Sequence, residues 1–177
     1  LEGARDVIAG AIGAAPADVV LTGGGTEACN LAVRGLAAGA RRIVRVGVPH
    51  PAVTASVDAA VADGAALLAI ASPDGVFPDA TLLGAVLDAA TVVVASWVDH
   101  ETGAVAPIED WASAIRRAGA RLVVDGTQAL GKRPVDVAAL GAHAVAFGAH
   151  KLGGPSGAGA LWIDRGVDLA PVLRGGA

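Results

Sequence analysis

Residues 91–96 read Thr-Val-Val-Val-Ala-Ser, a short β-branched stretch in which apolar residues follow one another without alternation. A strand with one face in water alternates apolar and polar residues, whereas a strand covered on both faces is apolar throughout. The stretch therefore predicts a strand inside a sheet that has helices on both sides. Six further segments fit strands of the same sheet: Val19–Thr22, Arg42–Val48, Ala65–Ile70, Arg121–Asp125, Ala144–Gly148 and Ala160–Asp164.

Helical patterns rich in Ala and Leu separate most of these strands. They cover Glu2–Gly13, Thr26–Ala38, Pro51–Ala62, Ala80–Ala89, Glu109–Ala118 and Asp136–Leu140. This alternation predicts right-handed crossovers and an α/β three-layer sandwich with a mainly parallel seven-stranded sheet. Only a Gly-rich link at 153–157 joins the last two strands, and so short a link cannot make a parallel crossover. The last strand is therefore expected to be antiparallel.

The composition indicates one domain with a core of small apolar residues. Of 177 residues, 54% are hydrophobic, 17% charged and 3% aromatic, and the net charge is −4. The apolar content excludes a disordered chain, and scattered basic residues in an acidic chain argue against a nucleic-acid partner. No uncharged apolar run reaches the length of about 18 residues that a membrane span needs, so no membrane association is expected. A single cysteine makes an oxidising compartment unnecessary, and we expect a cytoplasmic protein.

Polar residues gather where the predicted strands end. They are Gly23–Glu27 after the first strand, His50 after the second, Asp99–Glu101 after the fourth, Asp125 and Gln128 after the fifth, and His150 with Lys151 after the sixth. In an open parallel sheet, ligands bind beyond the carboxyl ends of the strands. Polar groups at five such ends predict a binding site at that edge.

The segment Gly23-Gly24-Gly25-Thr26 opens a predicted helix, where free backbone N–H groups and a hydroxyl favour a phosphate. It also fits the dinucleotide fingerprint Gly-x-Gly-x-x-Ala. That fingerprint expects an acidic residue at the end of the second strand, where this chain has Val48-Pro49-His50. A nicotinamide or flavin site is therefore disfavoured, and a simple tight turn stays as the alternative.

Lys151 and Asp125 add more specific chemistry. Lys151 lies in a largely apolar and Gly-rich segment, where loss of hydration would favour a nucleophilic amine, although the residue taken alone fits a hydrated surface lysine better. Asp125 ends an apolar strand, and a buried carboxylate needs a cationic partner. A phosphate-binding loop, a Schiff-base lysine and a carboxylate that holds a protonated pyridine nitrogen together describe a pyridoxal 5′-phosphate (PLP) site.

The motifs resemble the large domain of the class V aminotransferase family, and most closely its cysteine desulfurases. The matching segments are Leu21–Ala32, His50–Val53, His100–Gly103, Val124–Lys132 and Gly148–Pro155. The resemblance implies that residues 1–177 form a PLP-binding large domain of the type I transferase fold. It also implies that the family's N-terminal segment and C-terminal small domain, with a substrate-binding Arg and a sulfur-accepting loop Cys, are absent from this chain. The lack of Met, with Leu1 as the first residue, likewise indicates a piece of a longer product.

The resemblance assigns a role to each site residue. Lys151 would carry the cofactor as a Schiff base and, with His50, would move protons in catalysis. The other implied contacts to the cofactor are Asp125 on the pyridine nitrogen, Gln128 on the phenolic oxygen, His50 stacked on the ring, and Thr26, the Gly25 backbone and His150 on the phosphate. No metal is expected, and His143 receives no role.

Three positions depart from the family pattern or lack its function. His100 stands where the family usually has an Asn that contacts the phenolic oxygen. Gly148 stands where a phosphate-binding Ser is common, so one donor is missing. Cys29 lies inside the first helix motif, in the wrong place for the sulfur-accepting Cys, and we expect it to be a small packed core residue.

The implied reaction is removal of sulfur from L-cysteine to give alanine and an enzyme persulfide. A sulfur-acceptor protein would be a partner, the parent enzyme would be a homodimer, and the isolated chain would be inactive. The alternatives are a selenocysteine lyase, another C–S lyase, an aminotransferase or a non-catalytic scaffold fragment. A zinc site from His50, His100 and His150 is disfavoured because these residues have neither helical ligand spacing nor a Cys partner.

Overall fold

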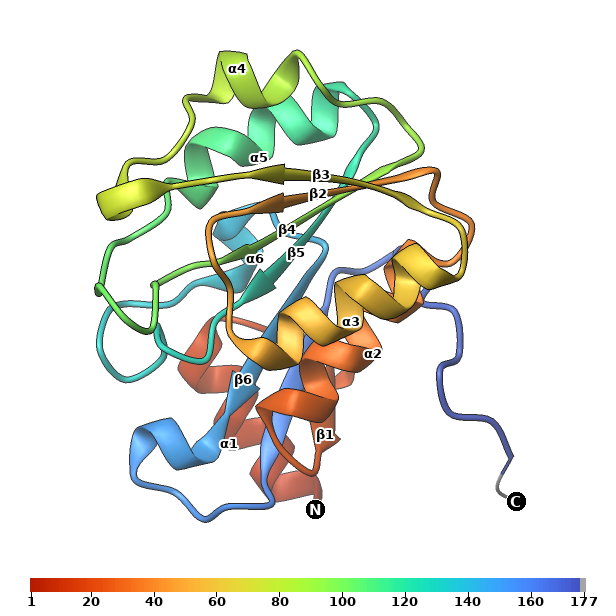
Figure 1. Ribbon diagram of the computed structural model, residues 1–177. Coiled ribbons are helices and arrows are strands. Elements are labelled where there is room, and N and C mark those ends of the chain that lie inside the picture. The colour runs from red at the N-terminus through yellow and green to blue at the C-terminus, as the bar shows by residue number, and fades with distance from the viewer. Residues whose placement is uncertain (176–177) are drawn as a thin grey trace.

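The computed structural model describes residues 1–175 and contains one seven-stranded sheet in the order β1-β7-β6-β5-β4-β2-β3 (Figure 1). The strands are β1 (Val19–Thr22), β2 (Arg42–Val46), β3 (Ala66–Ile70), β4 (Thr91–Ser96), β5 (Arg121–Asp125), β6 (Ala144–Gly148) and β7 (Gly159–Ile163). All seven predicted strands are present. The expected fold class is therefore confirmed.

The pairing of β7 also confirms the expected antiparallel last strand. β2, β3, β4, β5 and β6 run parallel to one another, whereas β7 pairs antiparallel with both β6 and β1. β7 thus lies inside the sheet, between β6 and β1, and β1 runs in the direction of the parallel strands. As a result, the loops after β1, β2, β4, β5 and β6 all leave the sheet at the same edge.

Helices cover both faces of the sheet. They are α1 (Glu2–Ile12), α2 (Gly25–Ala37), α3 (Pro51–Ala62), α4 (Ala80–Gly84), α5 (Ile108–Arg117) and α6 (Val137–Leu140). One core contains α2 and α3, which lie side by side in Figure 1, and the other contains α1, α4, α5 and α6. Alternate residues of β4 enter the two cores, with Val92 and Val94 on the first side and Val93 and Ala95 on the second. This explains why the stretch at 91–96 is apolar without alternation.

Two predicted elements are longer than the observed ones by more than one residue. The helix predicted over 80–89 ends at Gly84, because the following segment forms a turn around Asp88. The carboxylate of Asp88 accepts from the Ala90 N–H at 2.9 Å and from the Thr91 hydroxyl at 2.8 Å. The strand predicted over 42–48 ends at Val46, because Gly47 takes a left-handed conformation with φ 78°.

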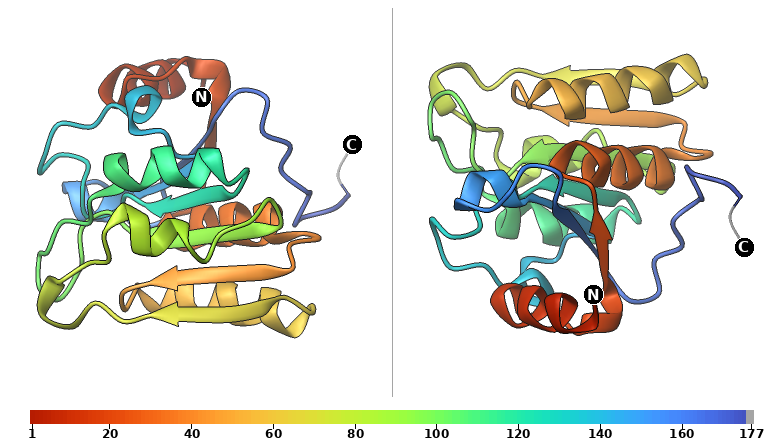
Figure 2. Two further views of the ribbon diagram at one scale, coloured as in Figure 1. Left: turned by 90° about the horizontal axis from the view of Figure 1, so that it is seen from above. Right: turned by 90° about the horizontal axis from the view of Figure 1, so that it is seen from below.

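After β7 the described chain has no further helix or strand. This segment first packs on α2, where the Ala170 N–H donates to the Gly35 carbonyl at 3.2 Å, and its end then extends away from the sheet in both views of Figure 2. No helix within residues 1–175 combines the length and the apolar character that a membrane crossing requires.

Candidate active site

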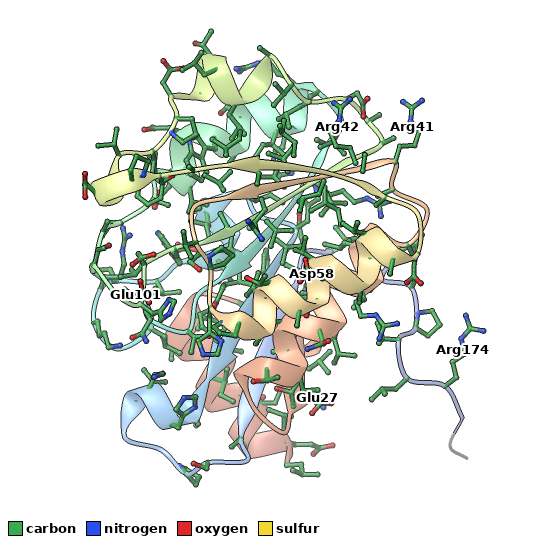
Figure 3. The ribbon with its side chains drawn as sticks, in the orientation of Figure 1. Glu27, Arg41, Arg42, Asp58, Glu101 and Arg174 are labelled. Carbon is green, nitrogen blue, oxygen red and sulfur yellow. The ribbon has the colours of Figure 1, made fainter. Side chains whose placement is uncertain are left out.

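A cavity of about 140 Å³ lies at the edge of the sheet where the parallel strands end. Figure 3 shows Glu101 on the loop after β4 at this edge, and Arg41 and Arg42 at the start of β2 on the opposite edge. The lining residues are Gly25, Thr26, Cys29, His50, Ala52, Ser96, Val98, His100, Asp125, Thr127, Gln128, His150 and Lys151. All eight residues that the resemblance assigns to the cofactor are among them, whereas Asp99 and Glu101 after β4 do not line the cavity.

The first turn of α2 forms one wall of the cavity. Gly24 precedes the helix with φ 145°, a conformation that residues with a side chain rarely adopt. The backbone then enters the helix at Gly25 and Thr26, where the first N–H groups of a helix have no partner within it. The partial positive charge at this end attracts anions, so Gly25 and Thr26 can hold a phosphate.

His50 is held by the start of α3. It is the N-cap residue of this helix, and its Nδ1 accepts a hydrogen bond from the Ala52 N–H at 3.1 Å. In the neutral ring the proton therefore resides on Nε2, which is left free to act as a donor. The His100 ring lies edge-on to it, with 5.4 Å between the ring centroids and an interplanar angle of 69°. The substitution of Asn by His at position 100 thus places a second imidazole beside the first.

Asp125 ends β5 and is only 8% exposed. Its Oδ1 accepts two hydrogen bonds from Thr127, one from the backbone N–H at 3.0 Å and one from the hydroxyl at 2.5 Å. Within residues 1–175, no hydrogen bond reaches Oδ2 and no ion pair includes this carboxylate. A buried carboxylate with only neutral donors favours a ligand that brings a positive charge. A protonated pyridine nitrogen is such a group.

Gln128 follows in the same loop, and its Oε1 accepts a hydrogen bond from Lys132 Nζ. The oxygen of the amide is thereby occupied, so its nitrogen is the end that remains for a ligand oxygen. Lys132 itself is not among the residues that line the cavity. Its position makes it a neighbour of the site rather than an anchor for a cofactor.

His150 and Lys151 lie in a single turn, Ala149–Leu152, directly after β6. The structure confirms the hydrated surface lysine, and the loss of hydration suggested by the apolar and Gly-rich sequence is absent. Residues 150–157 are all exposed, so the flanking glycines and Pro155 form an open loop and not a cover over the amine. Lys151 is therefore hydrated and freely accessible from the cavity.

Cys29 is buried, as expected, and is 3% exposed. It also lines the cavity from α2. Burial, reinforced by the negative charge of Asp125, raises the pKa of the Cys29 thiol well above its usual value. The thiolate is the nucleophilic form of cysteine, so this residue is disfavoured as a sulfur acceptor.

Sequence reasoning gave no role to Thr127, Ser96, Val98 or Ala52, which also line the cavity. Thr127 stands between Asp125 and Gln128, and Ser96 ends β4, so position in a motif or at a strand end was the available signal. Ala52 and Val98 carry no such signal, because small apolar residues are common throughout this chain.

His143 lies outside the cavity and serves the fold. It precedes β6, and its Nδ1 accepts a hydrogen bond from the Leu122 N–H at 3.0 Å. Burial and the charge of Arg116 lower the pKa of His143, while Asp164 opposes them. The histidine is thus held in its neutral form.

His50, His100 and His150 share the cavity, yet no group of three or more His, Cys, Asp and Glu side chains in the described part of the chain is placed to hold a metal ion.

The groups that line the cavity fit PLP on three counts. Asp125 offers Oδ2 to a protonated nitrogen, the first turn of α2 suits a phosphate, and Lys151 presents an accessible amine. The backbone is also closely packed around Thr127, since an added Cβ at Gly25 or at Gly148 would lie 3.3 Å from that side chain.

Comparisons with known proteins identify relatives over the whole chain. The Aminotransferase class-V family model matches residues 1–177. An IscS-like cysteine desulfurase of Mycobacterium tuberculosis is 36% identical over 187 residues, and a cysteine desulfurase of Frankia sp. is 40% identical over 194 residues. Each match includes 99% of this chain but 48% and 46%, respectively, of the relative. The chain thus spans about half the length of the curated relatives it matches.

Solved structures of similar proteins show the same fold. SspA in complex with cysteine has a TM-score of 0.91 and 26% identity, over 99% of this chain and 52% of that one. A mutant of C-DES with glycine covalently linked to its PLP cofactor has a TM-score of 0.86 and 26% identity, over 98% of this chain and 48% of that one. With the family model matched from the first residue to the last, the chain belongs to the class-V aminotransferase family.

Proposed function

We propose that residues 1–177 form the PLP-binding large domain of a cysteine desulfurase. The observation that carries this proposal is the convergence of Lys151, Asp125 and the first turn of α2 on one cavity. Two cysteine desulfurases at 36% and 40% identity and a PLP-bound structural relative support it. The whole enzyme would convert L-cysteine to alanine and would pass the sulfur to a cysteine thiol as a persulfide.

Each cavity residue would have one task in binding the cofactor. Lys151 Nζ would hold it covalently, Asp125 Oδ2 would keep its pyridine nitrogen protonated, and the amide nitrogen of Gln128 would donate to its phenolic oxygen. The backbone N–H of Gly25, the hydroxyl of Thr26 and a ring nitrogen of His150 would bind its phosphate. When bound, PLP supplies an electron sink for the negative charge that develops at the substrate carbon.

Proton transfer would be the work of Lys151 and His50. The exposed amine of Lys151 can reach a substrate in the cavity, where it would take and return the proton at the substrate α-carbon. The ring of His50 is fixed by the Ala52 N–H, so its Nε2 proton is presented in one orientation toward a ligand. His100 lies against this ring and would take the position of the family's Asn beside the phenolic oxygen.

The sulfur acceptor would be a cysteine other than Cys29, whose thiol is buried and held neutral. In the enzyme that we propose, the C–S bond of cysteine breaks, the sulfur joins that acceptor thiolate, and alanine leaves. The persulfide would then serve a sulfur-acceptor protein. We also propose a cytoplasmic homodimer, for which the single buried cysteine and the acidic composition are the supporting observations on location.

The test uses the purified whole enzyme that we propose, with PLP and L-cysteine. Dithiothreitol is added as the reductant that frees sulfide from a persulfide. We expect alanine and sulfide in equal amounts. Pyruvate and ammonia in place of alanine would identify a C–S lyase, and no turnover with intact PLP absorbance would identify a scaffold. The 177-residue chain assayed alone should release no sulfide, since the family's substrate-binding Arg would have to come from elsewhere in the protein.

A second candidate is a C–S lyase, because one structural relative is the cystine C–S lyase C-DES in complex with its product, cysteine persulfide. The same assay with L-cystine separates the two candidates. A lyase would release pyruvate from cystine and would leave free cysteine persulfide.

A further inference from the structure

His100 lies on a loop whose backbone is fixed by its own hydrogen bonds. The loop follows β4 and includes Glu101, which is labelled in Figure 3. Oδ1 of Asp99 accepts from the Glu101 N–H at 3.0 Å, from the Thr102 N–H at 2.8 Å and from the Thr102 hydroxyl at 2.9 Å. The His100 ring lines the cavity and is exposed, and its centroid lies 5.4 Å from that of His50. The loop thus holds a second imidazole in the cavity.

The two imidazoles differ in the nitrogen atoms that they leave free. Nδ1 of His50 accepts from the Ala52 N–H at 3.1 Å, so the neutral ring carries its proton on Nε2 and offers only a donor. Within residues 1–175, no hydrogen bond reaches either ring nitrogen of His100. A neutral imidazole has one N–H and one lone pair, so His100 can donate at one nitrogen and take up a proton at the other. The Asn that the family usually has at this position cannot take up a proton.

An amino acid that displaces Lys151 from the cofactor must first lose a proton. The reference pKa of an α-amino group is about 7.7–8.0, and the charge of a neighbouring carboxylate raises it further. At pH 7, at least about 80% of the substrate therefore carries an ammonium group. An ammonium nitrogen has no lone pair with which to attack, so a base in the cavity would serve most substrate molecules.

The remaining ionisable groups around His100 are either engaged or unsuited to this task. Those that line the cavity with it are Cys29, His50, Asp125, His150 and Lys151, and Asp99 and Glu101 flank it on its own loop. In the proposed site, the cofactor engages Lys151, Asp125 and His150. The Cys29 thiol is neutral, because burial and the charge of Asp125 raise its pKa. The lone pair of His50 is bonded to Ala52, which leaves His100.

We infer that His100 is a catalytic base that takes a proton from the α-ammonium group of the incoming amino acid. The inference rests on the proposed PLP site and adds a residue to it. In this step an N–H bond of the ammonium group breaks and an N–H bond forms on the imidazole. The electron pair stays on the amine, which can then displace Lys151. The proton passes from the imidazole to solvent, because the His100 side chain is exposed. The carboxylates of Asp99 and Glu101 favour the approach of a cationic group to this ring.

The first test is His100→Asn, which restores the family's residue and removes only the capacity to take up a proton. The whole enzyme that we propose is loaded with PLP and mixed with L-cysteine or L-alanine. The rate at which the cofactor absorbance changes measures capture of the amine before any sulfur is released. At pH 7 the variant would capture only the free amine, so this rate should fall at least about fivefold. The deficit should shrink as the pH rises toward 9.5 and the amine loses its proton. Added imidazole should restore part of the rate in His100→Ala.

His143→Asn is the matched control, because it removes an imidazole that lies outside the cavity. This variant should show the wild-type capture rates at both pH values. Wild-type capture by His100→Asn at pH 7 would overturn the inference and assign the proton to the cofactor or to solvent. A deficit of equal size at pH 7 and pH 9.5 would also overturn it, because the ring would then only shape the cavity.

The second test uses the cofactor-free protein and does not depend on activity. Diethyl pyrocarbonate acylates an imidazole nitrogen that has a free lone pair, and peptide mass spectrometry gives the rate for each histidine. His100 should react roughly 2- to 10-fold faster than His50, the size expected for one hydrogen bond between neutral groups. His143 should react more slowly than His100 as well, because its Nδ1 accepts from the Leu122 N–H at 3.0 Å. A His50 that reacts as fast as His100 would overturn the assignment of the free lone pair.

Failure of this inference is distinguishable from failure of the proposed function. A PLP-bound enzyme that releases no sulfide, yet shows the pH-dependent capture deficit in His100→Asn, would refute the desulfurase activity and support the role of His100. A whole enzyme that does not bind PLP would refute both.

Discussion

Replacement of Asp125 by Asn changes the chemistry of the site with little change in shape. The Asn side chain keeps an Oδ1 that can accept both bonds from Thr127, at the present distances of 3.0 and 2.5 Å. At the other position an NH₂ group replaces Oδ2. It cannot accept a proton from the pyridine nitrogen, and it presents a donor to that nitrogen instead. We therefore expect PLP to bind while turnover falls.

The size of the loss follows from the burial of Asp125, which is 8% exposed. Loss of one partner of a buried charge pair costs about 3–5 kcal/mol, which corresponds to a fall in kcat of roughly 10²- to 5 × 10³-fold. The stability of the cofactor-free protein should move the other way. Its buried carboxylate has only neutral donors among the described residues, so a neutral amide should leave the free energy of unfolding unchanged or higher.

The assay measures PLP affinity by absorbance, turnover as alanine formation, and unfolding in urea without cofactor. Asp136→Asn is the matched control, because Asp136 caps α6 outside the cavity by accepting from the Ala139 N–H at 3.0 Å and Asn is an equally good cap. Turnover within a few-fold of the wild type in the Asp125→Asn protein would refute the role of Asp125. A large loss of stability without PLP would show that the carboxylate holds the fold instead.

Three further predictions concern the anchor, pH and packing. Lys151→Ala should abolish the visible absorbance of bound PLP. The free energy of unfolding should stay within about 0.5 kcal/mol of the wild-type value, because Lys151 is exposed. Lys132→Ala should keep the absorbance, and the reverse result would make Lys132 the anchor. The pKa of His143 is lowered in the folded state, so the unfolded chain binds a proton first as the pH falls below about 6.5, and the free energy of unfolding should decrease from there toward the lower folded-state value. Urea unfolding at pH 7.5 and 5.5 should show a smaller decrease for His143→Asn, and an equal decrease would assign the effect to other groups. Gly159→Ala should lower the free energy of unfolding by about 1–3 kcal/mol, because its Cβ would lie 2.6 Å from the Gly24 carbonyl carbon and 2.7 Å from the Phe147 oxygen. Gly10→Ala in α1, whose Cβ would have nothing within 4 Å, should stabilise the protein. Equal effects of the two substitutions would contradict this account.

The sheet was predictable because its strands are buried on both faces. Burial on both faces requires apolar residues at consecutive positions, as at 91–96, and helices between such strands require the parallel arrangement. The end of α4 was not predictable by the same logic. It depends on the Asp88 side chain, which accepts bonds from Ala90 and Thr91 and so offers the backbone an alternative to the helix.

The loss of hydration that the sequence around Lys151 suggested is absent for a different reason. Apolar neighbours in sequence bury a side chain only if the backbone folds them over it. Here the turn at Ala149–Leu152 and the glycines that follow hold residues 150–157 open to solvent. Local composition therefore did not determine the surroundings of the amine.

The site is formed by two kinds of contact, those within a short sequence motif and those between different strand ends. Orientation is local, because His50 is held by Ala52 two residues away, Asp125 by Thr127 two residues away, and Gln128 by Lys132 four residues away. Such contacts lie inside short motifs, which is why those motifs point to the cavity residues without a structure.

The sheet, in contrast, brings these side chains into one cavity, because its parallel strands all end at the same edge. Contacts between different strand ends, such as Thr127 with Gly25 and Gly148, leave no mark within any one motif. A change at such a contact should therefore be compensated at a position far away in sequence. Thr127 and Gly148 form such a contact, because they lie twenty-one residues apart in the chain and are adjacent in space.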